Sequence, residues 1–250
     1  MFKSFFSKVG IGAAKVDTRI STPVIHPGGF LAGTTVVQGG MTTQDIDDIY
    51  LHFSTSAQHD GHYTTVEFYK VKISDRFTIG EREEKHIPFR IQMPPELPIT
   101  VVNGQYTMPY NGLYVRTAMD IAYALDATDN DRFEVEPHPA QDAVLRALEY
   151  LGFSLHKVDI ENGQLQGSRM PFFQEFEYKA YHTAYGNRVN ELEMSFIGRQ
   201  NECEVVLEMD KRGGFMSFGG DKYRSFLIPY SGYERMDMAG AIDRAIRSAI

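Results

Sequence analysis

Apolar and polar residues alternate along much of the chain from Phe30 onward. In one clear segment, Ile49, Leu51 and Phe53 are separated by more polar neighbours. A period of two is typical of strands with one buried face. The same alternation recurs at 69–74, 86–93 and 113–126. Turn signals separate these runs, at Gly39-Gly40, Asp60-Gly61, Asn103-Gly104 and Asn111-Gly112. Short strands with frequent turns predict a β-sandwich or a barrel.

The period becomes helical after Pro139, a residue that suits the first position of a helix. The apolar residues that follow at spacings of three and four are Ala140, Val144, Ala147, Leu148 and Leu151. Alternating segments then resume at 153–161, 172–181, 191–198 and 202–210. A second helical stripe over 238–249 predicts a closing helix.

We therefore expect a mainly β protein built from two tandem β-sandwich domains, residues 1–135 and 136–250. Helices are expected at the N-terminus, between the halves and at the C-terminus. Three closely spaced prolines, Pro94, Pro95 and Pro98, should stop the strand that precedes them.

An acidic run, residues 124–137, lies where the two domains should meet. As a calcium loop starting at Asp126 it lacks two requirements, because Asp131 occupies the turn-glycine position and Pro137 the position of the bidentate glutamate. We interpret Asp126, Asp129 and Asp131 as parts of a solvated connector between domains.

Composition narrows the functional classes. The formal net charge is −8, and lysine and arginine form no basic stripe, so nucleic acid is not expected as a partner. A hydrophobic fraction of 42% and a charged fraction of 23% are typical of a folded globular chain.

Cys203 is the only cysteine. An intrachain disulfide is therefore ruled out, and a cysteine-based zinc site is not expected. Its acidic neighbours disfavour the thiolate, so we interpret Cys203 as a small strand residue. With no signal-peptide core or transmembrane run in the sequence, a cytoplasmic location is expected.

The chain resembles the sporulation-control protein family of bacteria, within the arrestin-like superfamily. The segments that carry the resemblance are VGIGAAKVDT, VVQGGMTTQDIDDIYL, IPFRIQMPPELPIT, LYVRTAMDIAYALDATDND, HPAQDAVLRALEYLGF, FFQEFEYKA and NELEMSFI. The resemblance implies tandem immunoglobulin-like sandwiches joined by a hinge, which act through surfaces on other proteins. It implies no catalytic residues, and the polar core and phosphate-sensing lysines of arrestins proper find no match here.

Two local motifs have chemical alternatives. His59 and His62 flank Asp60-Gly61, which we interpret as a hairpin turn in preference to a metal site. The glycine-rich segment 211–225 lacks the patterns of phosphate-binding loops, so we expect a loop between strands whose basic residues are available to a partner. Neither a G-x-S-x-G nor an H-E-x-x-H signature occurs, and we expect no enzyme activity, cofactor or metal.

The N-terminal segment places Phe2, Phe5, Phe6 and Val9 on one helical face. Three uses fit this face: packing on its own domain, contact with a partner or another copy of the chain, and contact with a membrane surface. With only Lys3 and Lys8 beside it, lipid headgroups are the least favoured.

The function expected from these features is that of a non-enzymatic scaffold or adaptor that binds other proteins. Partner contact or homo-oligomer formation would use Phe2, Phe5, Phe6 and Val9. The alternative is a membrane-peripheral protein that uses the same face.

Overall fold

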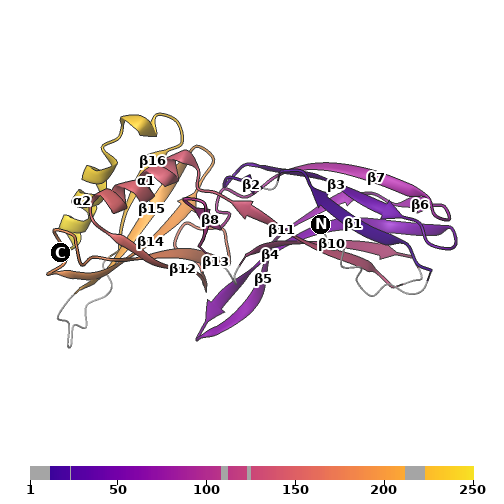
Figure 1. Cartoon of the computed structure of the whole chain (residues 1–250), viewed down its shortest axis with the longest axis horizontal. Coiled ribbons are helices and arrows are strands. Elements are labelled where there is room, and N and C mark those ends of the chain that lie inside the picture. The colour runs from indigo at the N-terminus through magenta and orange to yellow at the C-terminus, as the bar shows by residue number, and fades with distance from the viewer. Residues whose placement is uncertain (1–11, 23, 108–111, 123–124, 212–222) are drawn as a thin grey trace.

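The structure is a computed structural model that describes residues 12–22, 24–107, 112–122, 125–211 and 223–250. It is mainly β, and its two halves lie at opposite ends of the long axis (Figure 1). The strands of the first half are β1 (Lys15–Ile20), β2 (Val24–Ile25), β3 (Phe30–Gln38), β4 (Gln44–His59), β5 (His62–Ser74), β6 (Phe77–Ile79), β7 (Glu84–Gln92), β8 (Val101–Val102), β9 (Gln105–Tyr106), β10 (Leu113–Ile121) and β11 (Ala127–Val135).

The second half contains helices as well as strands. They are α1 (Pro139–Tyr150), β12 (Ser154–Asn162), β13 (Phe172–Lys179), β14 (Val189–Gly198), β15 (Glu202–Lys211), β16 (Arg224–Pro229), a 3-10 turn (Tyr233–Arg235) and α2 (Met238–Ala249). None of the helices in the described residues is both long and apolar enough to cross a membrane.

The first half packs the three-stranded sheet β1-β3-β7 against β4, β10 and β11. Apolar side chains from both layers form two clusters, one around Phe53 and Val115 and the other around Ile49 and Met119. Burying such faces between two sheets supplies the main stabilisation.

Threonine hydroxyls lie between these two clusters. Thr18 Oγ1 is 2.9 Å from Thr35 Oγ1 and 2.7 Å from Thr117 Oγ1, and all three residues are buried. On β10, Thr117 sits between Val115 and Met119, one from each cluster. The buried hydroxyls satisfy one another, so the polar layer costs little and divides the core in two.

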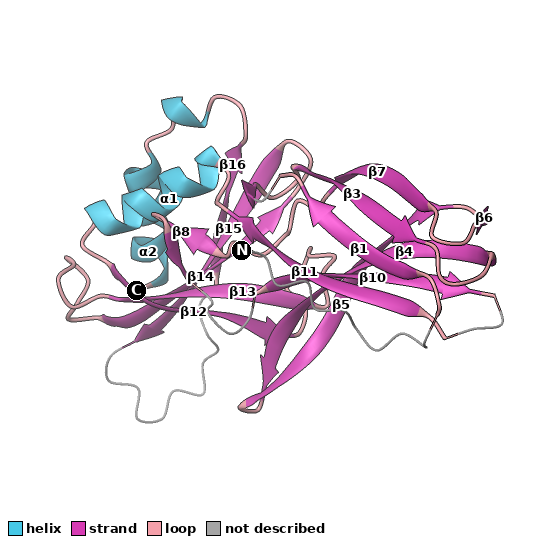
Figure 2. Ribbon diagram, turned by 45° about the vertical axis from the view of Figure 1, so that its right-hand side comes forward, coloured by secondary structure: helices cyan, strands magenta, loops and turns pink. Residues whose placement is uncertain are grey.

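The second half has one antiparallel series, β12-β13-β14-β15-β16, and both α1 and α2 pack on the same face of it (Figure 2). Every second residue of the strands joins the core with the helices, including Phe176, Met194 and Val205. The described strands thus do not confirm a second sandwich; one sheet is covered by helices on one face.

Strand β4 connects the halves. It is 16 residues long, pairs with β10 along its first part, and near its end pairs in parallel with β12 at Gln58 and Glu161. Through it, strands from both halves join one continuous hydrogen-bonded sheet of 11 strands, while β1-β3-β7 and β8-β9 form separate sheets.

Helix α1 begins as its sequence predicts. Pro139 occupies the first turn, where no intrahelical donor is needed, and His138 caps the helix by accepting a hydrogen bond from the Ala140 N–H at 3.2 Å. Gln141 accepts from the His138 N–H at 2.9 Å, which completes a capping box.

The prediction of an acidic connector is wrong. Residues from Ala127 onward form β11, which pairs with β10 inside the first half. Asp129 accepts a hydrogen bond from the Thr18 N–H at 2.7 Å and so fastens β11 to β1. The alternation on β10 also ends earlier than expected, at Ile121, and Leu125 is 70% exposed. The chain passes between halves at residues 136–138.

The predicted hairpin at His59 and His62 is confirmed. Strand β4 ends at His59, β5 begins at His62, and the two residues face each other in the ladder. Asp60 and Gly61 have φ of 49° and 77°, the left-handed values that a two-residue turn of this kind requires.

Candidate functional site at the junction of the two halves

The loop after β7, residues 94–100, contacts both halves, and we call it the junction loop. The prolines Pro94 and Pro95 have no N–H to donate, so β7 cannot continue through them. Leu97 and Ile99 are 3% and 2% exposed, although they lie in a loop. Ile99 belongs to the core cluster of the second half.

Gln174 of β13 holds the backbone of the junction loop. The Ile99 N–H donates to Gln174 Oε1 at 2.8 Å, and Gln174 Nε2 donates to the Ile99 carbonyl at 2.7 Å. One side-chain amide therefore satisfies both peptide groups of a buried residue, as a neighbouring strand would. This pairing fixes the loop to the sheet of the second half.

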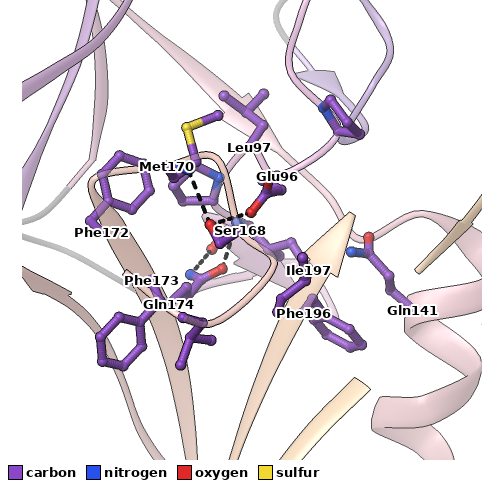
Figure 3. A pocket seen from close by; sticks show the side chains of 14 residues that line it. Glu96, Leu97, Gln141, Ser168, Met170, Phe172, Phe173, Gln174, Phe196 and Ile197 are labelled. Carbon is purple, nitrogen blue, oxygen red and sulfur yellow. Dashed lines mark hydrogen bonds between the residues drawn. The ribbon is translucent and has the colours of Figure 1, made fainter. Parts of the chain in front are cut away.

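Glu96 makes a second attachment. Its carboxylate accepts hydrogen bonds from the Ser168 hydroxyl at 2.5 Å and from the Arg169 N–H at 3.0 Å. Ser168 Oγ in turn accepts from the Met170 N–H at 3.0 Å. The residues that make these bonds line a small pocket of about 20 Å³, shown in Figure 3, which has room for about one water molecule.

Close backbone contact adds a steric constraint. A Cβ at Gly198, the last residue of β14, would lie 1.8 Å from the Pro95 carbonyl oxygen. Only glycine lets β14 approach the junction loop this closely.

Strand β5 contributes an aromatic bridge through a β-bulge. Phe53 pairs with Tyr69 and Ser54 with Glu67, so Phe68 is the extra residue. A bulge re-aims side chains. Tyr69 packs on Phe53 of the first half at 5.8 Å between centroids, while Phe68 packs edge-on against Phe172 of the second half at 5.5 Å. Phe68 contacts the cores of both halves.

Three titratable groups near this junction have shifted pKa values. Burial raises the pKa of the Cys203 thiol to about 12, so the thiolate is suppressed, as the sequence predicted for a strand residue. Burial and then Cys203 raise the pKa of Tyr230. Burial, followed by the charge of His26, lowers the pKa of His138, whose ring lies 4.4 Å from that of Tyr230. Burial therefore keeps the Cys203 thiol protonated and the His138 imidazole neutral near pH 7.

The face of β12–β16 opposite the helices, which we call the open face, is acidic. Glu175, Glu193 and Glu208 bring one carboxylate oxygen each to within 4.8 Å of the others, an arrangement that can hold a cation. Burial, and then the negative charge of Glu193 and its neighbours, raise the pKa of Glu175 to about 8.

A groove of about 630 Å³ lies on the same side, between the segment 164–167 and the strands β14–β16. Ile197 and Val206 contribute apolar side chains to it, and Arg199 forms an ion pair with Glu204 at 2.5 Å.

The residues predicted for partner contact, Phe2, Phe5, Phe6 and Val9, lie outside the described residues, as does most of the basic segment 211–225. His59 and His62 join no cluster of three metal-ligating side chains in the part of the chain that the structure describes. Sequence reasoning missed Gln174, Glu96 and the glutamate cluster. The only local signal was the run of prolines that ends β7.

Comparisons with known proteins agree on one family. The model of the family described as SpoOM protein matches residues 2–213. The sporulation-control protein spo0M of Bacillus subtilis (strain 168) is 35% identical over 215 residues, which cover 84% of this chain and 81% of that protein. The crystal structure of Spo0M from Bacillus subtilis superposes with a TM-score of 0.82 at 30% identity, covering 96% of this chain and 100% of the other.

Proposed function

This chain belongs to the SpoOM protein family, and we propose that it is a non-enzymatic regulatory protein that acts by binding other proteins. The name of its Bacillus subtilis relative, a sporulation-control protein, supports a regulatory role. The proposal includes an arrestin-like organisation, in which two β-rich halves present binding surfaces on either side of a junction.

The observation that carries the proposal is the open face. A sheet normally buries one face and exposes the other to water, but here the exposed face also carries a groove beside half-buried carboxylates. Ser225 and the 46% exposed Leu227 lie on β16 at the margin of this face. Concave, partly apolar surfaces of this kind are suited to partner binding.

Photo-crosslinking in the native host tests the proposal. A photoreactive amino acid at Ser225 or Leu227 should yield a discrete protein adduct. The control position is Tyr150 at the end of α1, which is 84% exposed and lies with the helices on the other side of the sheet. If neither Ser225 nor Leu227 forms an adduct, partner binding at the open face is contradicted.

The N-terminal aromatic positions Phe2, Phe5, Phe6 and Val9 are proposed as a second contact, with a partner or another copy of the chain. Changing Phe2, Phe5 and Phe6 to Ser should shift the chain to a smaller species in analytical ultracentrifugation, or reduce recovery of the partner. Cosedimentation with liposomes that is lost in the same variant would instead support the membrane-peripheral alternative. Strong thermal stabilisation by a metabolite would contradict the non-enzymatic interpretation.

A further inference from the structure

We propose that the free edge of β5 pairs with the same edge of a second copy of this chain, so that two chains form one continuous sheet. The contact lies on the hairpin arm, which we define as the end of the β4–β5 hairpin, residues 54–67. It goes beyond the proposed function, because it uses neither the groove of the open face nor the N-terminal phenylalanines.

The hairpin arm exposes one edge of its outer strand. Among the described residues, β5 pairs with β4 and with no other strand. The arm projects from the body of the molecule in both ribbon views (Figure 1, Figure 2). Four consecutive residues of β5, His62 to Thr65, are exposed, so both faces of the strand end are in contact with solvent. The outer edge of β5 is therefore open to another strand.

Other sheet edges in the described part of the chain carry features that discourage pairing. Pro88 lies in the middle of β7, and Pro229 ends β16. The edge strand β1 is fastened to β11 through Thr18 and Asp129. In contrast, the segment of β5 from His62 to Val66 contains no proline, lysine, arginine, aspartate or glutamate. Its tyrosine, threonines and valine favour strands, so this edge lacks the usual protection.

The register of the hairpin decides which backbone groups of β5 face outward. A two-residue turn joins the strands, so His59 and His62 make the hydrogen-bonded pair that closes the hairpin. Antiparallel ladders alternate such pairs with pairs that do not exchange hydrogen bonds. The N–H and C=O groups of Tyr63, Thr65 and Glu67 therefore point away from β4 and toward the free edge.

The even spacing of these three residues makes the edge self-complementary. Two identical strands that pair antiparallel are related by a two-fold axis, which passes between two identical residues. With the axis at Thr65, Tyr63 of one copy lies opposite Glu67 of the other. Each outward N–H then meets an outward C=O of the second copy, so the pairing satisfies the outward groups of the segment.

Side chains that face each other in this register are also complementary. The Tyr63 hydroxyl is a donor opposite the Glu67 carboxylate of the second copy, and Tyr63 is 52% exposed in the single chain. Thr65 faces Thr65, a pair that stabilises sheets, and Thr64 faces Val66. The two Glu67 carboxylates lie four residues apart along the strands, roughly 14 Å, so their mutual repulsion is weak.

Charges at the two ends of the overlap have opposite signs. The Asp60 side chain in the turn is 90% exposed, and the same register extends it toward the exposed Lys70 of the second copy. The two-fold axis repeats this approach at the other end. Complementary charges of this kind fix the register of an interface.

Charge substitutions at Thr65 test the two-fold register by analytical ultracentrifugation of the full chain. Thr65→Asp and Thr65→Lys each place like charges opposite each other on the axis, so we expect the Kd of the dimer to rise at least tenfold in each. An equimolar mixture of the two variants should recover a heterodimer with a Kd within threefold of the wild type, because opposite charges then face each other. Ser225→Asp, an exposed position on the edge strand β16, is the control and should change the Kd less than twofold.

Recovery in the mixture cannot come from a misfolded variant. A wild type that stays monomeric up to about 1 mM, or a mixture that stays monomeric, would overturn the inference. Self-association that is lost when Phe2, Phe5 and Phe6 are changed to Ser, and is unchanged in Thr65→Asp, would belong to the N-terminal face and would also overturn it.

Hydrogen exchange tests the alternation along β5. The amides of Tyr63 and Thr65 should gain protection as the protein concentration rises through the Kd, because their N–H groups point outward. The amides of Thr64 and Val66 bond to β4 and should show little change over the same range. Exchange at Tyr63 and Thr65 that does not depend on concentration would contradict pairing of the strands.

Photo-crosslinking in the native host identifies the occupant of this edge. An aromatic photoreactive amino acid at Tyr63 should yield an adduct between two copies of the chain, joined through residues 62–67 of each. An adduct with a different protein, and none with a second copy, would assign the edge to a strand of that protein and overturn the inference. Because this readout does not involve Ser225 or Leu227, failure of partner binding at the open face would leave it unchanged.

Discussion

The two halves bury their strands in different ways. In the first half, two sheets pack face to face, and their inward side chains form two clusters on either side of the threonine hydroxyls. In the second half, two amphipathic helices cover one face of a single series of strands. A sheet that is covered by helices has its other face free for charge, and this is where the glutamates gather.

The halves also differ in whether the apolar core of each one includes residues from the other. Both clusters of the first half consist of residues between Ala14 and Val135. The cluster of the second half includes Ala57, Ile99 and Val102 from the first. The apolar core of the second half therefore depends on the first half and not the reverse, which makes the first half a candidate for independent folding and the second half a poor one.

Separated fragments should show the largest effect. We expect residues 1–135 to fold cooperatively, and residues 136–250 to lose most strand signal because their core lacks three buried side chains and the attachment to the junction loop. Far-UV circular dichroism and urea unfolding measure both fragments, since the chain has no tryptophan. Adding fragment 1–135 should restore signal to the other fragment. A stable 136–250 with an unfolded 1–135 would reverse the comparison.

Gly198→Ala introduces a steric clash at the junction. The new Cβ would meet the Pro95 carbonyl oxygen at 1.8 Å, and neither backbone can yield cheaply. We expect a loss of about 3 kcal/mol in the free energy of unfolding, typical of severe overpacking. Gly112→Ala is the matched control, because in the part of the chain that the structure describes its added Cβ meets no atom within 4 Å beyond its chain neighbours. Urea titration measures both; equal stability of the two variants would show that the contact is not constrained.

Gln174→Ala removes a polar attachment at the same junction. It leaves the buried N–H and carbonyl of Ile99 without their amide partner, at a cost of about 2 kcal/mol. Protection of the Ile99 amide from hydrogen exchange should fall with it. Gln92→Ala on the exposed side of β7 serves as the control. Unchanged exchange at Ile99 would mean that the loop is held by other contacts.

The sequence allowed the strands and two helices to be predicted because periodicity is a local signal. Ile49, Leu51 and Phe53 alternate and are fully buried, and α1 begins at Pro139. Contacts between distant segments gave no such signal. Asp129 looked like part of a solvated connector, yet its partner is the Thr18 N–H, 111 residues away.

The junction could be predicted only in part, for the same reason. The prolines showed where β7 ends, but nothing local links Ile99 to Gln174, 75 residues further on. The glutamate cluster depends on the register of β13, β14 and β15, because a shift of one residue would place the carboxylates on the other face.

Each half contains a carboxyl group whose pKa is raised into the neutral range, and a pH series on these two groups gives the smallest expected effect. Burial, then the charge of Asp129, raise the pKa of Asp131 in the first half from 3.8 to about 7; in the second half the pKa of Glu175 rises from 4.5 to about 8. Between the lower and the higher pKa, the folded state holds a proton that the unfolded state has released. The free energy of unfolding therefore falls as the pH rises from the lower pKa to the higher one.

Asp131→Asn should therefore stabilise the chain relative to the wild type at pH 8, and Glu175→Gln at pH 9, with both differences vanishing near pH 4. The gains should stay below about 1 kcal/mol, because both carboxyl groups are partly exposed and solvent screens them. Thermal unfolding between pH 4 and 9 measures the difference. If the gain from Asp131→Asn has the same size at every pH, its cause is packing and not ionisation. If only Glu175→Gln shows the pH dependence, electrostatic strain is confined to the open face and the sandwich core of the first half is free of it.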